Sequence, residues 1–82
     1  MPETPRELTI PEILTLVEQF GDCAKRAKAA GFDAVEVHGA HGYLAGAFAS
    51  PFSNKRSDEY GGTIRNRARF GMEIIRNIKE KC

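Results

Sequence analysis

The chain contains 82 residues, and its 12 basic and 11 acidic residues give a net charge of +1. Because 41% of the residues are hydrophobic and 28% are charged, the composition is typical of a globular protein and excludes a disordered one. Binding to nucleic acid ordinarily requires a concentrated basic surface, which this balance of charges does not provide. We therefore expect no nucleic-acid partner.

No stretch of the sequence approaches the roughly 18 uncharged apolar residues that a membrane-spanning helix requires. The first residues also lack the basic and then apolar order of a secretory signal, so we expect a cytoplasmic protein with no membrane partner. The two cysteines, Cys23 and Cys82, provide neither a disulfide framework nor the spacing of metal ligands. We expect no metal site, and we interpret Cys23 as a packing residue.

The first predicted element is a helix over about residues 10–30. Thr9 and Glu12 have the spacing of a capping box, and Pro11 lies in the first turn, where its missing N–H removes no helical bond. Gly31 is typical of the left-handed residue that ends a helix. The predicted apolar face, at helical spacing, comprises Ile10, Ile13, Leu14, Val17, Phe20, Ala24 and Ala27.

Residues 32–38 form the only segment that is predicted to be a strand. The segment contains the β-branched Val35 and Val37, follows a helix stop directly and is bounded downstream by Gly39. Its alternation places the two valines on one face and His38 on the other.

One short helical turn over about residues 43–48 and a long loop lead to a second long helix, which Thr63 is expected to cap. Within the loop, we expect Arg56 and Asp58 to pair or to bind loop backbone, and Tyr60 to cover apolar surface. The predicted apolar face of the second helix comprises Ile64, Ala68, Gly71, Ile74, Ile75 and Ile78, and we interpret its arginines Arg65, Arg67, Arg69 and Arg76 as a solvated or salt-bridged face.

The order helix, strand, long loop, helix predicts an α/β fold that is incomplete on its own. A single strand leaves backbone N–H and C=O groups unpaired on both edges, and two amphipathic helices need a sheet to cover. An α/β barrel typically requires about 250 residues. The chain should therefore need either the rest of a barrel, which we favour, or copies of itself in a homo-oligomer.

The chemistry-bearing residues gather in the run His38-Gly39-Ala40-His41-Gly42-Tyr43, at the carboxyl end of the predicted strand. In α/β barrels that end carries the active site. Two imidazoles can donate hydrogen bonds to a carbonyl or nitro oxygen, and a neighbouring phenol can donate a proton. Spacing alone leaves a structural loop role open for both histidines, and it disfavours a metal pair because no third ligand stands out.

The run from Ala30 to Leu44 resembles the old yellow enzyme family of FMN-dependent NAD(P)H:flavin oxidoreductases. Further segments that carry the resemblance are Phe48, Ser50-Pro51, Asn54-Lys55-Arg56, Asp58-Glu59-Tyr60-Gly61-Gly62 and Asn66-Arg67-Ala68-Arg69-Phe70. The resemblance implies a TIM (β/α)8 barrel with FMN at its mouth, of which residues 1–82 would be a partial domain.

The resemblance also implies a role for each ring. His38 and His41 would bind the substrate oxygen, and Tyr43 would protonate the α-carbon of an α,β-unsaturated carbonyl or enoate while hydride from FMN reaches the β-carbon. NADH or NADPH would be the reductant. The FMN ligands are expected outside this segment and stay unknown, and a longer parent could also carry FAD and an iron–sulfur cluster.

Two alternatives stay open. One is a segment of an amine dehydrogenase-like flavoprotein, and the other is a catalytically inactive barrel fragment that acts only in packing or oligomerisation. Two hydrogen-bond donors suit a substrate oxygen better than an amine cation, so we favour the ene-reductase. We expect the isolated 82-residue chain to be inactive.

Overall fold

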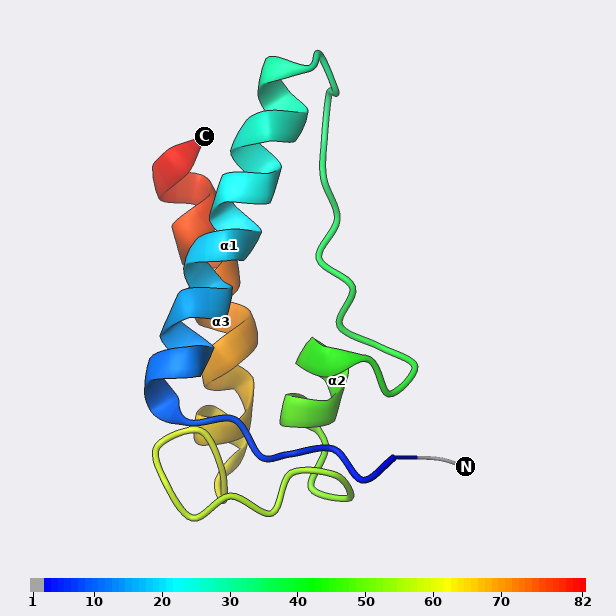
Figure 1. The fold of residues 1–82 in the computed structure, drawn as a ribbon, viewed down its shortest axis with the longest axis vertical. Helices are drawn as coiled ribbons and strands as arrows, with labels where there is room; N and C mark the ends of the chain where they lie inside the picture. Colours follow the sequence, from blue (N-terminus) through cyan, green and yellow to red (C-terminus); the bar gives the residue numbers. More distant parts are fainter. Residues whose placement is uncertain (1–2) are drawn as a thin grey trace.

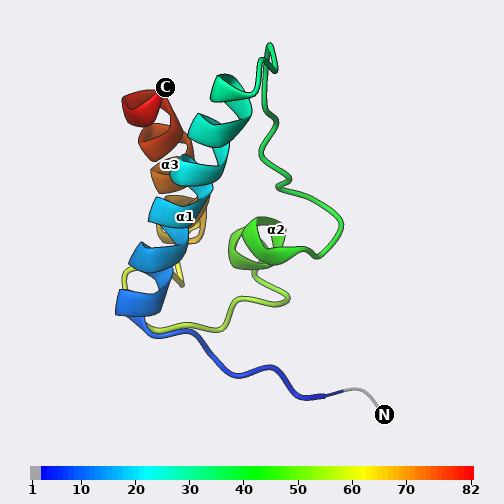
Figure 2. The same cartoon turned by 45° about the horizontal axis from the view of Figure 1, so that its top comes forward.

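The structure is a computed structural model, and it describes residues 3–82. It contains the long helices α1 (Ile10–Ala29) and α3 (Ile64–Lys81) and the short helix α2 (Leu44–Ala49). The two long helices lie side by side, and α2 packs against α3 near the end of the pair where α1 begins (Figure 1). Figure 2 shows the same arrangement, with the extended segment before α2 standing apart from the helix pair.

The predicted ends of α1 and the predicted start of α3 are confirmed, because they are set by local contacts. Glu12 N donates to Thr9 Oγ1 at 3.3 Å, and Thr9 N donates to Glu12 Oε1 at 2.9 Å, which completes the capping box. Gly31 takes a left-handed φ of +96° just beyond α1. Thr63 Oγ1 accepts from Asn66 N at 3.2 Å and so caps α3.

A small aromatic core lies between the helices. Ile13 of α1 and Phe70 and Ile74 of α3 are completely buried. Phe48 of α2 stacks on Phe70 with ring centroids 4.6 Å apart, and it meets the Tyr60 ring edge to face at 6.5 Å. Each such side chain contributes about 1.5–3 kcal/mol through the burial of apolar surface, so this cluster holds α2 against the helix pair.

The buried face of each long helix is narrower than predicted. Leu14, Ile64 and Ile75 were assigned to the apolar faces but are about half or more exposed, because α1 and α3 cover only one side of each other. Phe70 was omitted from the predicted face and lies at the centre of the core. Cys23 is exposed, so its interpretation as a packing residue is wrong: its neighbour Ala24 is buried instead.

The predicted strand over residues 32–38 is absent, and the described residues 3–82 form no strand at all. The segment runs as a single extended stretch from the end of α1 toward α2 (Figure 1). A strand requires a neighbour that accepts and donates ladder hydrogen bonds, and no other described segment provides one. Within these residues the α/β prediction is therefore corrected to an all-helical arrangement.

None of the three helices is long and apolar enough to cross a membrane, as judged over the residues that the structure describes. The same residues contain no group of three or more histidine, cysteine, aspartate or glutamate side chains that could hold a metal ion.

Candidate active site at the start of α2

Three aromatic rings gather where the extended segment turns into α2. The rings of His38 and Tyr43 have centroids 4.8 Å apart and are tilted by 42°. The ring of His41 lies 5.5 Å from that of His38 and meets it edge to face. The structure thus brings together all three residues that the sequence singled out.

A sharp backbone turn produces this gathering. His41 and Gly42 are consecutive left-handed residues, with φ of +58° and +74°, and Tyr43 N donates to Ala40 O at 3.3 Å. Histidine tolerates this conformation better than most side chains, although a strained backbone of this kind costs of order 1 kcal/mol or more. The turn reverses the chain, so that the Tyr43 ring comes back over His38.

The backbone also favours one tautomer of His38. Ala40 N donates to His38 Nδ1 in a long hydrogen bond of 3.4 Å. A neutral imidazole that accepts at Nδ1 carries its proton on Nε2. His38 therefore presents an N–H donor on the side of the ring that faces away from its own backbone.

The three rings lie at the surface of the described residues. Both histidines are exposed, and Tyr43 is 64% exposed. A hollow of about 340 Å³ lies beside α2 and is lined by Leu8, Leu44, Phe48 and Arg56 among others, but none of the three rings lines it. Within the described residues, the three rings therefore face the surface and not this hollow.

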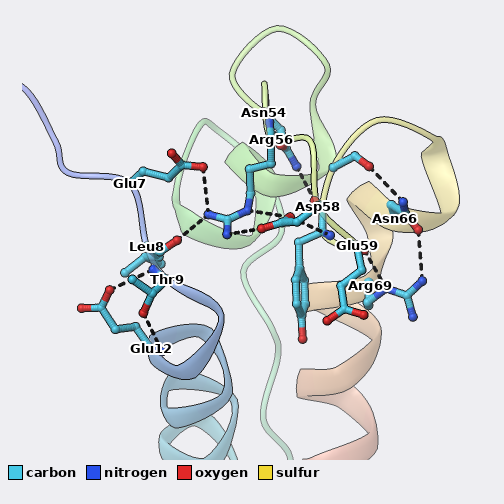
Figure 3. Close-up of polar contacts among 12 residues, drawn as sticks. Glu7, Leu8, Thr9, Glu12, Asn54, Arg56, Asp58, Glu59, Asn66 and Arg69 are labelled. Carbon is cyan, nitrogen blue, oxygen red and sulfur yellow. Dashed lines mark hydrogen bonds and ion pairs between the residues drawn. The ribbon is translucent and has the colours of Figure 1, made fainter.

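The loop after α2 is built around a buried amide and an ion pair (Figure 3). Asn54 Nδ2 donates to Tyr60 O at 2.8 Å, and Asn54 Oδ1 accepts from Arg56 N at 3.0 Å. Arg56 donates two hydrogen bonds to Asp58, at 2.6 and 3.1 Å, and a third to Leu8 O at 2.7 Å. The guanidinium group holds the pKa of Asp58 below its usual range. The predicted pairing of Arg56 and Asp58 is confirmed.

Asn54 and two arginines of α3 were not predicted to bind backbone carbonyls of α2 and of the loop. Arg67 donates to Ala49 O and Gly62 O at 3.0 and 2.6 Å, and Arg69 donates to Glu59 O at 2.7 Å. Their interpretation as a solvated or salt-bridged face is therefore wrong for these two. The bond from Arg56 N to Asn54 is the local turn that asparagine favours, and this pattern is the one signal in the sequence that could have indicated Asn54.

The family model for the NADH:flavin oxidoreductase / NADH oxidase family matches residues 1–82. The turn with its three rings and the loop after α2 therefore belong to a protein of that flavin-dependent class. More particularly, the chain is a member of the old yellow enzyme family.

Individual relatives agree with this assignment. The chain is 59% identical over 76 residues to an NADH oxidase of Thermoanaerobacter brockii, with 93% of this chain and 12% of the relative covered. It is 54% identical over 78 residues to an NADPH dehydrogenase of Clostridium acetobutylicum, with 95% and 23% covered. It is 51% identical over 80 residues to a cinnamate reductase of Clostridium sporogenes, with 96% and 12% covered.

The chain is also similar to part of a solved structure. It superposes on morphinone reductase with a TM-score of 0.92 and 46% identity, and the match covers 95% of this chain and 21% of that enzyme. A structure of morphinone reductase in complex with tetrahydroNAD matches with a TM-score of 0.93. The chain thus spans between 12% and 23% of the length of these relatives.

Members of this family use FMN as the cofactor and NADH or NADPH as the reductant. The described residues provide groups that suit the substrate in such a site, but none that we assign to FMN. Two imidazoles and a phenol are donors that suit the oxygen of a small molecule, whereas the guanidinium groups of Arg56, Arg67 and Arg69 are engaged by protein oxygens. We therefore assign no residue of this chain to the FMN phosphate.

Proposed function

We propose that residues 1–82 are part of a TIM (β/α)8 barrel domain of a cytoplasmic oxidoreductase that reduces the C=C bond of α,β-unsaturated carbonyl or enoate substrates. Two features support a barrel segment: residues 32–38 are extended with both edges unpaired, and both long helices expose apolar side chains. In the complete domain, the extended segment would pair with strands that these residues do not include.

The observation that carries the proposed activity is the gathering of His38, His41 and Tyr43 within one turn. In this family FMN, when bound, supplies the hydride. As the alkene is reduced, negative charge builds on the carbonyl oxygen of the substrate. The two imidazole N–H groups would stabilise that charge, and each well-aimed donor contributes about 3 kcal/mol to such a transition state.

Tyr43 would donate the proton that completes the reduction. With the substrate oxygen held by the histidines, the α-carbon lies within reach of a ring whose centroid is 4.8 Å from that of His38. The hydride forms the new bond at the β-carbon, and the phenol proton forms the one at the α-carbon. The phenolate then regains a proton from water, to which the ring is open here.

The proposal is tested in a complete enzyme that contains this chain. We suggest a chimera in which residues 1–82 replace the matching segment of the Clostridium acetobutylicum NADPH dehydrogenase, which is 54% identical over 78 residues. The expected product is a yellow protein that NADPH bleaches under anaerobic conditions and that cyclohexenone reoxidises. A yellow chimera that cyclohexenone fails to reoxidise would favour the amine dehydrogenase-like alternative, and a colourless one would favour the inactive segment.

A further inference from the structure

The position of Tyr43 depends on a helix that is too short to be stable by itself. α2 has six residues, and Tyr43 is the residue immediately before it. Isolated helices of this length are unstable in water, and Tyr43 provides no side-chain cap for α2. The contacts that hold α2 in the fold therefore also determine where the Tyr43 ring lies.

Asn54 makes the central contact at the far end of α2. Its Nδ2 donates to Phe48 O at 2.6 Å and to Tyr60 O at 2.8 Å, and the residue is only 9% exposed. A buried amide that meets two carbonyls from different segments fixes their separation, because leaving either carbonyl unpaired would be costly. Asn54 thereby ties the end of α2 to the loop that leads into α3.

Two further side chains take the neighbouring carbonyls of α2. Ser53 Oγ donates to Ala47 O at 2.7 Å, and Arg67 Nε donates to Ala49 O at 3.0 Å. Arg67 belongs to α3 and also binds Gly62 O, so it links α2 to a long helix. Three successive carbonyls at the end of α2 are therefore each held by a side chain.

The turn that contains both histidines, residues 38–43, packs directly on the same helix; we call it the histidine turn. A Cβ atom built on Gly46 would lie 3.1 Å from Gly39 O and 3.2 Å from Ala40 N. Contacts this close show that the backbone between His38 and His41 packs tightly on α2, because a side chain at Gly46 would push it back by a few tenths of an ångström. A displacement of α2 would therefore move the histidine turn and Tyr43 together.

We propose that Asn54 and Arg67 are positioning residues for Tyr43 and act through α2. This inference rests on the function proposed above, because it concerns the placement of the same proton donor. Neither side chain hydrogen-bonds to any of the three rings. Asn54 and Arg67 are thus the two anchors of α2, and loss of either one should let α2 shift. A displacement of the proton donor by about 1 Å can slow a reaction by up to about a hundredfold.

The test uses the chimeric enzyme with two test substitutions, one control and one reference. Asn54→Asp keeps the oxygen that accepts from Arg56 N, but it replaces the amide N–H donors with a carboxylate oxygen that faces the carbonyls of Phe48 and Tyr60. Arg67→Met keeps a side chain of similar length but removes both hydrogen bonds to carbonyls. Arg65→Met is the matched control, because Arg65 is exposed on the same helix and donates no hydrogen bond within residues 3–82. Tyr43→Phe provides the reference for a lost proton donor.

Three readouts separate positioning from general damage. Reoxidation of the reduced flavin by cyclohexenone should be about tenfold slower in both anchor variants, whereas reoxidation by ferricyanide, which requires no proton from Tyr43, should be unchanged. Hydrogen exchange of the amides in α2 should also become faster, and the Arg65→Met control should match the parent chimera in all three measurements.

The outcomes are distinguishable. If Tyr43→Phe leaves the cyclohexenone rate unchanged, the proposed function fails. If Tyr43→Phe slows that rate but Asn54→Asp and Arg67→Met do not, the positioning role is wrong. It is equally wrong if the cyclohexenone and ferricyanide rates fall together. If Asn54→Asp does not fold, Arg67→Met decides alone, since it changes a side chain at the surface.

Discussion

The hydroxyl of Tyr60 donates a 2.7 Å hydrogen bond to Oε1 of Glu73 and so joins the loop after α2 to the middle of α3. The Tyr60 ring is almost completely buried, and burial together with the Glu73 carboxylate raises the pKa of the phenol above its ordinary value. Tyr60 therefore stays neutral and serves as a structural donor, in contrast to the exposed Tyr43.

Removing the hydroxyl of Tyr60 should weaken the fold of the chimeric enzyme. Tyr60→Phe leaves the ring in place but deletes the bond to Glu73, and we expect a loss of about 1 kcal/mol in the free energy of unfolding. Urea denaturation measures this change. Tyr43→Phe is the matched control, since its hydroxyl makes no hydrogen bond within the described residues, and an equal loss in both variants would contradict the structural role of the Tyr60 bond.

Gly21 should be sensitive to any added side chain. It is buried where α1 meets α3, and a Cβ atom there would overlap the amide of Asn77. Gly21→Ala should therefore lower the free energy of unfolding, but by less than the roughly 1–3 kcal/mol typical of overpacking, because the Asn77 side chain can turn aside and alanine favours a helix over glycine by about 1 kcal/mol. Combining it with Asn77→Ala should recover part of the loss, because the obstructing amide is removed. Strictly additive losses in the double variant would show that the two helices do not meet as described.

The start of α1 should become less stable in acid. The bond from Arg6 and the capping contacts with Thr9 lower the pKa of Glu12 to about 2, from an ordinary value of 4.5. A depressed carboxyl pKa contributes stability that is present above the unfolded value and is lost as the pH falls toward the folded one. Glu12→Gln should therefore be less stable than the parent at pH 7, and the difference should shrink between pH 4.5 and 2. A difference that is constant with pH would exclude the ion pair with Arg6 as its source.

The two histidines should bind a phenol that mimics the charged substrate oxygen. His41→Gly keeps a residue that tolerates the left-handed backbone at this position, so it removes the imidazole, and leaves no side-chain donor in its place, without straining the turn. Loss of one hydrogen bond to a charged oxygen should weaken phenol binding to the chimera by about 1.5–3 kcal/mol, which is measured from the long-wavelength absorption of the flavin–phenol complex. Unchanged phenol affinity would contradict the donor role.

Features that depend on neighbouring residues could be predicted from the sequence. Thr9, Glu12 and Gly31 determine the ends of α1 through contacts within a few residues, so the predicted bounds agree with the structure. The gathering of His38 and Tyr43 also follows from a short turn that includes Gly42. The roles of these rings stay proposals.

Features that depend on distant segments could not be predicted. A strand over residues 32–38 needs partners that the described residues do not supply, so its β-branched composition was insufficient. Asn54 and Arg67 bind carbonyls whose positions depend on how α2 packs against α3, and helical spacing contains no information about such contacts. The same reason explains why the face of α3 around Phe70 was misjudged.

The most direct test of the proposed activity is a stopped-flow comparison of the two half-reactions in the chimeric enzyme and its Tyr43→Phe variant. A general acid typically contributes a factor of at least about 100 to a rate. We predict that cyclohexenone reduction slows by about that factor in the variant while reduction of the flavin by NADPH stays nearly unchanged. Equal loss in both half-reactions, or no loss in either, would contradict the assignment of Tyr43 as the proton donor.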